Sequence, residues 1–459
     1  MKVKALSRSS DTYLPARSTE VSRTPRNLDP ELHPFQRARE YTRALNATKL
    51  ERVFATPFVG QLGHGHVDGV YCLAKNIRQV NIIASGSGDG VIKYWDLSSR
   101  EQVASFSAHR GIVNDLAVSL DGNLLSCGMD STVKYWDVSN PNDTSPVKTF
   151  LGSSGFTGID QHRSQSIFAT SSAKVELWDL NRSKPTVDLS WGADNANTVK
   201  FNQSEQSILA TTGSDRSLIL YDIRSNSPVQ KLITSMRSNA ISWNPMEAYV
   251  FATANEDHNA YMYDMRNLKK SLNVLKGHVM AVMDVDFSPT GQELVTGSYD
   301  RTLRIYNVRH GQSRDVYHTK RMQRLFSVKF TMDSQYILSG SDEGNIRVWR
   351  TNAAARSGVK SARQRTKLEY DEALKQKYKS LPEIRRISRH RHLPSSIKKA
   401  EDIKRIEIDS RKRKQDNMRM RSAKGSMPYV PEREKHIVGV ALKDTPDNET
   451  EDKFSEDIE

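Results

Sequence analysis

Histidine, aspartate and tryptophan recur together along this chain, with serine nearby, in a combination that resembles the machinery of nucleophilic catalysis. The two clearest copies are His66, Asp89 and Trp95, then His109, Asp130 and Trp136. A serine hydrolase needs one such set in one site, whereas here the set repeats at a regular interval. Repetition at that interval argues against a single catalytic site. We therefore expect that the protein is not an enzyme and has no catalytic residues.

Signatures of other chemistry are missing from the sequence. It has no GxxxxGK[ST] phosphate loop, no GxGxxG after a predicted strand and no HExxH. Its two cysteines, Cys72 and Cys127, are too few for a disulfide framework or a four-cysteine zinc site. Both lie in strand-like runs, so we expect them to be buried, in a reducing compartment. No cofactor and no metal ion are expected.

A repeat explains the spacing of the polar set. Seven segments align, among them ASGSGDGVIKYWD (84–96) and TGSYDRTLRIYN (296–307). Their aromatic anchors are Trp95, Trp136, Trp178, Tyr221, Tyr263, Tyr306 and Trp349. The anchors follow one another at intervals of 41, 42, 43, 42, 43 and 43 residues, which predicts a repeat architecture.

Each unit has period-2 alternation between turn residues, which predicts strands. Gly-His dipeptides precede two units, and the whole pattern resembles the WD-repeat family, whose unit is a four-stranded propeller blade. We therefore expect an all-β, seven-bladed WD-repeat β-propeller over residues 49–355. Residues 49–60 should supply its closing strand, with Val53 and Phe54 in that strand. The WD-repeat resemblance implies that the recurring His, Asp and Trp belong to a structural hydrogen-bond network that satisfies buried polar groups. The unit ending at Trp178 lacks its turn aspartate, so its network should be incomplete.

Two extensions flank the predicted propeller. Residues 1–48 form an N-terminal extension, in which 29–50 reads as a helix with Phe35, Ala38, Tyr41 and Leu45 near one face, and 1–27 as disordered. That helix is expected to pack on the propeller as a strut. Residues 356–440 read as a basic helical domain, and Tyr370, Leu374, Tyr378 and Leu381 form a stripe expected to dock on the same chain. Residues 441–459 read as an acidic disordered tail.

Charge is concentrated behind the propeller. The chain has a net charge of +14, with 68 Lys and Arg against 54 Asp and Glu. Residues 61–355 are nearly neutral, whereas residues 356–435 hold 25 Lys and Arg against 11 Asp and Glu. Such asymmetry suggests a polyanionic partner for the basic block, and a solubilising role is the alternative.

Particular cations are candidates for contact with RNA or a partner. They lie in an inter-blade loop, in the run IRRISRHRHLP and in the helical run after it: Lys320, Arg321, Arg385, Arg386, Arg389, Arg391, Lys398, Lys399, Lys404 and Arg405. Arginine forks bind phosphates and stack on unpaired bases, which suits folded RNA. The cluster of Arg411, Lys412, Arg413 and Lys414 also reads as a nuclear-import signal.

Longer motifs carry a more specific resemblance. They are LNATKLERVFATPF (45–58), WNPMEA (243–248), ANEDHNAYMYDMR (254–266), YHTKRMQ (317–323) and RISRHRHLP (386–394). Together they resemble the suppressor-of-fibrillarin family of WD-repeat proteins. The resemblance implies a scaffold component of the nucleolar small-subunit processome, needed for pre-ribosomal RNA processing and small-subunit assembly. The implied partners are pre-ribosomal RNA, a small nucleolar ribonucleoprotein and other processome proteins, in the nucleus and without a membrane.

Two other roles stay open. Some animal relatives in this family are also regarded as substrate receptors of a cullin-RING ubiquitin ligase, through a WD-x-R signature at blade ends. The nearest matches here are the YD-x-R runs that end at Arg224 and Arg266, in which tyrosine replaces tryptophan. The third role is a nuclear peptide-binding propeller whose site lies on its top face and central channel.

Overall fold

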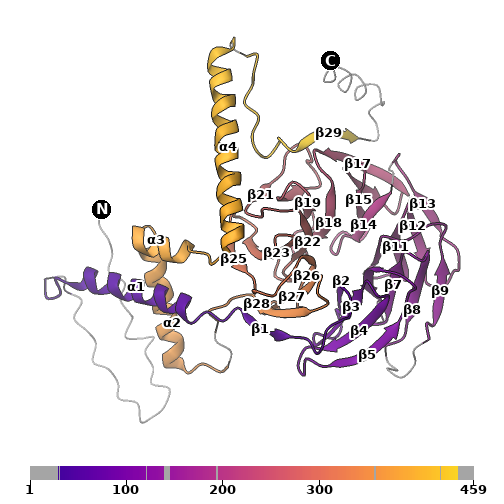
Figure 1. The fold of residues 1–459 in the computed structure, drawn as a ribbon, viewed down its shortest axis with the longest axis horizontal. Helices are drawn as coiled ribbons and strands as arrows, with labels where there is room; N and C mark the ends of the chain where they lie inside the picture. The colour runs from indigo at the N-terminus through magenta and orange to yellow at the C-terminus, as the bar shows by residue number, and fades with distance from the viewer. Residues whose placement is uncertain are drawn as a thin grey trace. The chain divides into compact units, whose positions relative to one another are not determined.

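Seven antiparallel β-sheets follow one another around a ring in the computed structural model of this chain (Figure 1). The structure describes residues 29, 31–119, 121–138, 145–192, 195–355, 358–423 and 425–442. The seven-bladed WD-repeat β-propeller expected from the sequence is confirmed, as are helices outside it. The segment 1–27 and the tail after Leu442, both expected to be disordered, lie outside the described residues.

Each blade runs from an inner strand to an outer strand. The first three blades are β2 (Val70–Lys75), β3 (Ile82–Ser87), β4 (Val91–Asp96) and β5 (Gln102–Ser107); β6 (Val113–Val118), β7 (Leu124–Gly128), β8 (Thr132–Trp136) and β9 (Lys148–Leu151); and β10 (Gly158–Gln161), β11 (Ile167–Ser171), β12 (Val175–Asp179) and β13 (Val187–Leu189). The next two are β14 (Ala196–Phe201), β15 (Ile208–Gly213), β16 (Ser217–Asp222) and β17 (Ser227–Thr234), then β18 (Ser238–Trp243), β19 (Val250–Asn255), β20 (Ala260–Asp264) and β21 (Asn273–Leu275). The last two are β22 (Val282–Phe287), β23 (Glu293–Ser298), β24 (Leu303–Asn307) and β25 (Ser313–Tyr317), then β26 (Leu325–Phe330), β27 (Tyr336–Ser341), β28 (Ile346–Arg350) and β1 (Phe58–Gln61).

Burial of the repeat anchors holds the blades together. All seven aromatic anchors have side chains that are no more than 1% exposed. Burying a large aromatic side chain stabilises the fold by roughly 1.5–3 kcal/mol. The tight turns need glycine at some positions: Gly90 has a φ of 80°, and a Cβ there would lie 2.1 Å from the carbonyl oxygen of His109. The alternation of buried side chains thus forms the core, and the tight turns set the pairing register of the strands.

The outer strand of the seventh blade comes from the opposite end of the chain. β1 pairs antiparallel with β28, and Phe58 lies opposite Trp349. This covers an edge that would otherwise be open to pairing with other chains. The strand begins nine residues later than the expected start at Lys49, because Val53 ends the preceding helix and Phe54 caps it.

Three helices make up a separate small unit. They are α1 (Gln36–Val53), α2 (Ala362–Lys377) and α3 (Pro382–Arg389). Their core contains Ala44, Leu374 and Ile384, with Tyr41 and Tyr378 packed against it. The expected stripe on α2 therefore does dock on the same chain, and its partners are α1 and α3.

The expected face of α1 is partly wrong. Phe35 is 73% exposed and Ala38 is also exposed, whereas the buried side chains of α1 are Glu40, Ala44 and Thr48. Burial of Glu40 is tolerated because its carboxylate accepts hydrogen bonds from Lys377 of α2 and from Tyr378, which caps that helix. A buried acid among the helix contacts is invisible to a search for apolar periodicity.

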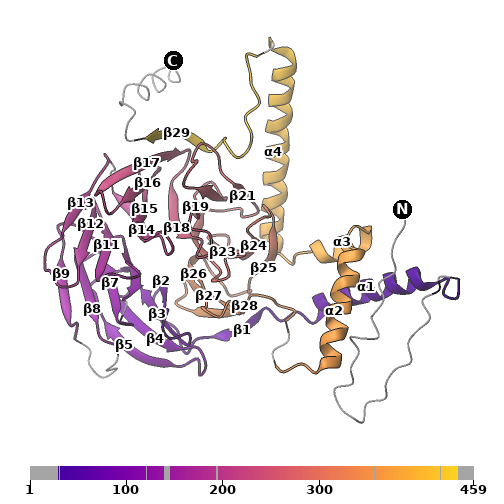
Figure 2. The ribbon, with the colours of Figure 1, turned by 180° about the vertical axis from the view of Figure 1, so that it is seen from behind.

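The rest of the C-terminal region groups with the propeller strands rather than with α2 and α3, so residues 356–440 do not form one compact unit. The helix α4 (Ser395–Arg421) has no buried residue. The strand β29 (Ile437–Leu442) adds a fifth strand to the fourth blade by pairing with β17, and the two lie side by side in both views (Figure 1 and Figure 2). A strand at this position was not expected in a helical region.

Candidate functional site

The recurring histidines form closed structural networks. In the second blade, Nδ1 of His109 lies 3.0 Å from Asp130, and its Nε2 lies 2.9 Å from the hydroxyl of Ser126. The indole N–H of Trp136 donates to that same hydroxyl at 3.0 Å. Ser126 is fully buried, so no substrate carbonyl can reach its oxygen. The arrangement joins two strands and a loop, as a structural network does.

The network varies between blades as the sequence indicates. His278 retains both partners, Asp300 at 2.8 Å and Thr296 at 2.7 Å. Burial raises the pKa of Asp300, but His278, Thr302 and Arg304 together outweigh burial, and the pKa falls to about 2. In the third blade the network is incomplete, as expected: the indole of Trp178 donates to Thr170, and no aspartate takes part.

The first blade is incomplete in a way that was not expected. The imidazole of His66 contacts Ser85 at 2.6 Å, but its Nδ1 is buried without a partner. Asp89 accepts a backbone hydrogen bond from Val91 instead. Burial, followed by the nearby Lys93, lowers the pKa of His66 to about 4.

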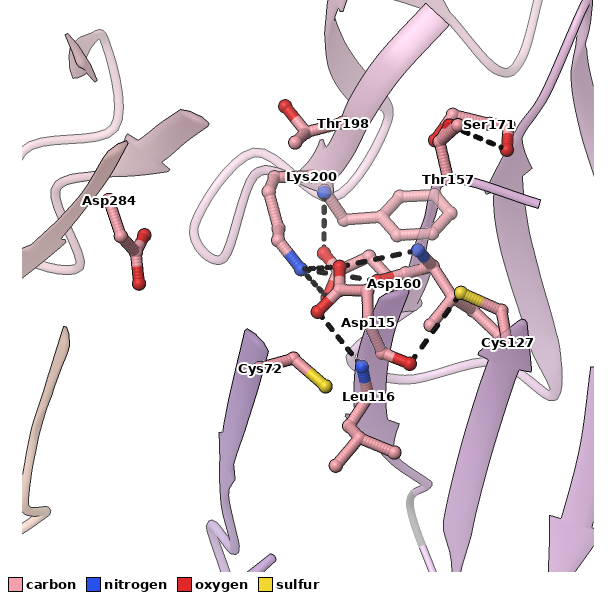
Figure 3. Close-up of polar contacts among 12 residues, drawn as sticks. Cys72, Asp115, Leu116, Cys127, Thr157, Asp160, Ser171, Thr198, Lys200 and Asp284 are labelled. Carbon is pink, nitrogen blue, oxygen red and sulfur yellow. Dashed lines mark hydrogen bonds and ion pairs between the residues drawn. The ribbon is translucent and has the colours of Figure 1, made fainter. Parts of the chain in front are cut away.

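Ion pairs join the inner strands of successive blades beside the central channel. Lys200 on β14 lies 3.0 Å from Asp115 on β6 and 3.7 Å from Asp160 on β10, and the three side chains point toward one another in Figure 3. Burial lowers the pKa of Lys200, but Asp115 and Asp160 outweigh it and raise the pKa above its usual value. The lysine therefore remains charged and holds three blades together.

A second set lies on the other side of the channel. Lys329 lies 3.1 Å from Asp284, and Lys75 lies 2.9 Å from Asp286. Both carboxylates also accept backbone hydrogen bonds from β26. These channel charges are used in joining blades, which argues against the channel as the site of the peptide-binding alternative.

Both cysteines are buried beside this network, as expected. Cys72 is 4% exposed and Cys127 is fully buried, and burial raises the pKa of both thiols well above the usual value. In the part of the chain that the structure describes, no group of three or more His, Cys, Asp or Glu could hold a metal ion. Among the described helices, none is both long and apolar enough to cross a bilayer.

The predicted cations lie in three places. In the inter-blade loop, Lys320 and Arg321 are exposed and Met322 between them and β26 is buried. On α3, Arg385, Arg386 and Arg389 are exposed.

Arg391 is less available. It is half-buried and donates to the backbone oxygens of Ser388 and His390. This ties it to the end of its own helix.

On α4 the cations divide by exposure. Lys398, Lys399 and Arg405 are exposed, although Arg405 pairs with Asp402 at 3.0 Å. Lys404 instead donates to the carbonyl oxygen of His278 at 3.0 Å. Burial lowers the pKa of Lys404, which fits a residue that attaches the helix to the sixth blade. All four residues of the import cluster, Arg411, Lys412, Arg413 and Lys414, are exposed.

The segment before β29 was missed as an attachment to the propeller. The ring of His436 stacks on Tyr261 with centroids 3.7 Å apart, and its carbonyl accepts from the backbone N–H of Ser235. Glu432 pairs with Lys276 of the fifth blade. The short run that contains the β-branched residues Ile437, Val438 and Val440 is the signal that could have identified the strand.

Comparison with known families agrees with this architecture. A family model described as a Sof1-like domain matches residues 351–437. A model described as WD domain, G-beta repeat matches residues 58–96, 100–137, 269–307 and 316–350, which cover strands of the first two and last two blades together with β21 of the fifth.

Relatives that align with nearly the whole chain show the family to which it belongs. The chain is 57% identical to Protein SOF1 of Saccharomyces cerevisiae, over 96% of each chain. It is 47% identical to the Gallus gallus protein named DDB1- and CUL4-associated factor 13, and 46% identical to the Homo sapiens protein of that name. These alignments cover 96% of this chain and the whole of each relative. The chain belongs to the Sof1 family of WD-repeat proteins.

Proposed function

We propose that this protein is a non-enzymatic scaffold of the small-subunit processome, needed for pre-ribosomal RNA processing and small-subunit assembly in the nucleolus. The observation that carries the proposal is α4, a helix of 27 residues with no buried side chain and with ten Lys and Arg against five Asp and Glu. A helix this exposed contributes little to its own chain's core. Its surface is instead available to a polyanion.

The propeller and the helices α3 and α4 have different roles in this proposal, because their charged groups are used differently. The charged groups of the channel pair with one another across blades, so the blades provide a rigid platform. The cations of α3 and α4 are mostly unpaired and exposed, so they provide contact with pre-ribosomal RNA, the small nucleolar ribonucleoprotein or neighbouring assembly factors. Arginine is well suited to this because its planar guanidinium binds phosphate through two hydrogen bonds.

The test compares the salt dependence of RNA binding. In the purified full chain, changing Arg385, Arg386 and Arg389 to Ala should reduce the slope of log affinity against log salt by up to roughly 0.7–0.9 for each phosphate that is no longer bound. The matched control changes three exposed propeller cations, Lys174, Arg182 and Lys184, to Ala. An unchanged slope in the α3 variant would assign these arginines to a protein partner. In cells, the protein should sediment with pre-ribosomes.

A ubiquitin-ligase receptor role is the second candidate. The relatives from Gallus gallus and Homo sapiens carry the name DDB1- and CUL4-associated factor 13. The side chain of Arg224 is 76% exposed, and its nearest carboxylate, Asp222, is 3.7 Å away. Arg266 is less free, because it binds Asp264 at 2.8 Å and lies over the ring of Tyr249.

Adaptor capture distinguishes this role. The double change Arg224→Ala and Arg266→Ala should abolish binding to the purified DDB1 adaptor while leaving RNA binding intact. Arg216→Ala, an exposed arginine at a turn of the same blade, serves as the control. Equal capture of all three proteins would remove this candidate.

A further inference from the structure

Aromatic side chains meet where the first and seventh blades adjoin. Tyr71 on β2 and Phe326 on β26 stack with ring centroids 4.7 Å apart and an interplanar angle of 14°. Tyr299, from the sixth blade, meets Phe326 edge-on at 5.8 Å. The guanidinium of Arg324 lies over the ring of Tyr299, 5.5 Å from its centroid. We call these four residues the aromatic patch.

A backbone irregularity places two of these rings outside the core. Tyr71 and Phe326 each follow the first residue of an inner strand, at a break in the pairing register. Such a bulge redirects the side chain, and both rings are accordingly only half-buried. At the same register break, the second, fifth and sixth blades have Asn114, Asn239 and Met283. A stacked aromatic pair is therefore a special feature of this part of the ring.

Glycines leave room for the rings. A Cβ at Gly88 would lie 2.9 Å from the ring of Tyr71, and one at Gly69 would lie 3.4 Å from the ring of Phe326. The core of the blades does not require these half-exposed rings, since the anchors Trp95 and Trp349 already fill it. The patch is thus a surface feature held in place by its surroundings.

Charges of both signs border the patch. Lys320, Arg321 and Arg324 are exposed on the loop that leads into β26. The exposed carboxylates Asp68 and Asp342 lie close enough to Tyr71 to raise its pKa, together with burial, which is the larger cause.

We propose that the aromatic patch binds an unpaired nucleotide of single-stranded RNA. A flat aromatic surface accepts any base by stacking, and arginine adds a cation–π contribution. The loop cations would contact the flanking phosphates, and the carboxylates Asp68 and Asp342 would accept from base amino groups. This site is on the propeller and does not depend on the role proposed for α3 and α4.

The geometry favours a base over a cationic side chain. A cage for a methylated or free ammonium needs ring faces directed at one common centre. Here one face of Tyr71 is stacked on one face of Phe326, and Arg324 lies over Tyr299, so the ring faces do not converge on one centre. Lys320, Arg321 and Arg324 also outnumber the two carboxylates, Asp68 and Asp342, and this excess of positive charge favours phosphate over a basic peptide.

Binding of short RNA to the full chain tests the site. Phe326→Leu and Tyr71→Leu keep apolar volume but remove the flat ring. Each should weaken binding of an unstructured single-stranded RNA by about 5- to 150-fold, the range expected when one base no longer stacks on an aromatic ring. Binding of a duplex RNA of the same composition should not change, because its bases are not available for stacking.

The controls separate stacking from damage to the fold. Tyr249→Leu removes another exposed tyrosine that carries an arginine, Arg266, over its ring, and it should not weaken either RNA. Phe326→Tyr should retain single-strand binding. Unchanged affinity in the Leu variants, or an equal loss for duplex and single strand, would overturn the proposal. So would an arginine-rich peptide that binds wild-type protein but not Phe326→Leu, because the occupant would then be a protein.

Discussion

Removal of one channel carboxylate should destabilise the propeller far more than removal of a surface carboxylate. Asp284 accepts hydrogen bonds from the ammonium of Lys329 at 3.1 Å and from the backbone N–H of Val328 at 2.9 Å. Its side chain is 12% exposed and that of Lys329 is 20% exposed. Asp284→Ala therefore leaves a largely buried cation and a buried N–H without this acceptor. Breaking a buried pair costs about 3–5 kcal/mol, and we expect the lower end because some water reaches the lysine.

A matched surface pair provides the comparison. Glu256 binds Arg237 at 2.7 Å, but the two side chains are 36% and 45% exposed. Exposed pairs contribute about 0–1 kcal/mol, so Glu256→Ala should change stability little. The double change Asp284→Leu with Lys329→Met removes both channel charges, and it should cost less than Asp284→Ala because no buried charge is left alone.

Urea unfolding followed by tryptophan fluorescence measures these differences. The chain has six tryptophans, and all lie between residues 95 and 349, so the signal reports on the propeller rather than on the helical unit. The free energies of unfolding are compared at one pH and salt concentration. If Asp284→Ala and Glu256→Ala lower stability equally, the channel pairs do not brace the blades and the reasoning is refuted.

Three further results are expected. The pKa of His66 is lowered to about 4 in the folded state, so the unfolded chain takes up this proton at higher pH than the folded chain does. The stability due to neutral His66 should therefore be lost as pH falls from about 6.5 toward 4. Urea midpoints across that range should vary less in His66→Gln than in the wild type, and an unaltered pH profile would contradict this. Gly90→Ala should lower the melting temperature strongly, because the new Cβ would lie 2.1 Å from a carbonyl oxygen. Gly111→Ala should not lower it, because no atom lies within 4 Å of the new Cβ. Similar melting curves for the two variants would count against the turn geometry. Deleting residues from Glu432 onward should speed hydrogen exchange in β17 but not in β9, since only β17 loses a paired strand. Equal protection of β17 in the full chain and in the truncated chain would show that β29 does not pair in solution.

Much of the propeller could be predicted from local patterns. The aromatic anchors and the turn residues recur with each blade, so one blade's period-2 pattern applies to all seven. The buried positions of Cys72 and Cys127, and the missing aspartate near Trp178, also followed from their place in the repeat. The helical unit was only half predictable, because the stripe around Leu374 is apolar but its partner helix buries the charged Glu40.

The candidate contact residues show where local reasoning ends. Composition alone identifies a basic block, and it treats Arg386, Arg391, Lys399 and Lys404 alike. The fold separates them, since Arg391 and Lys404 donate to backbone oxygens while Arg386 and Lys399 are exposed. Which cations remain available depends on neighbours that are distant in the chain.

By itself, the sequence determined the number of blades, the family and the location of excess charge. The regular period of the anchors gives the number of blades, the long motifs give the family, and a count of charged residues locates the excess charge. Only the tertiary structure decided the rest. It brought Tyr71 beside Phe326, Lys200 beside Asp115, and β29 beside β17, across 255, 85 and 203 residues of chain respectively. The first two contacts arise because closing a ring places the first and last blades side by side and points inner-strand residues at one channel, whereas the third arises because the chain after α4 returns to the outer edge of the fourth blade. No local pattern of residues encodes such a closure, since it depends on all seven blades packing at once.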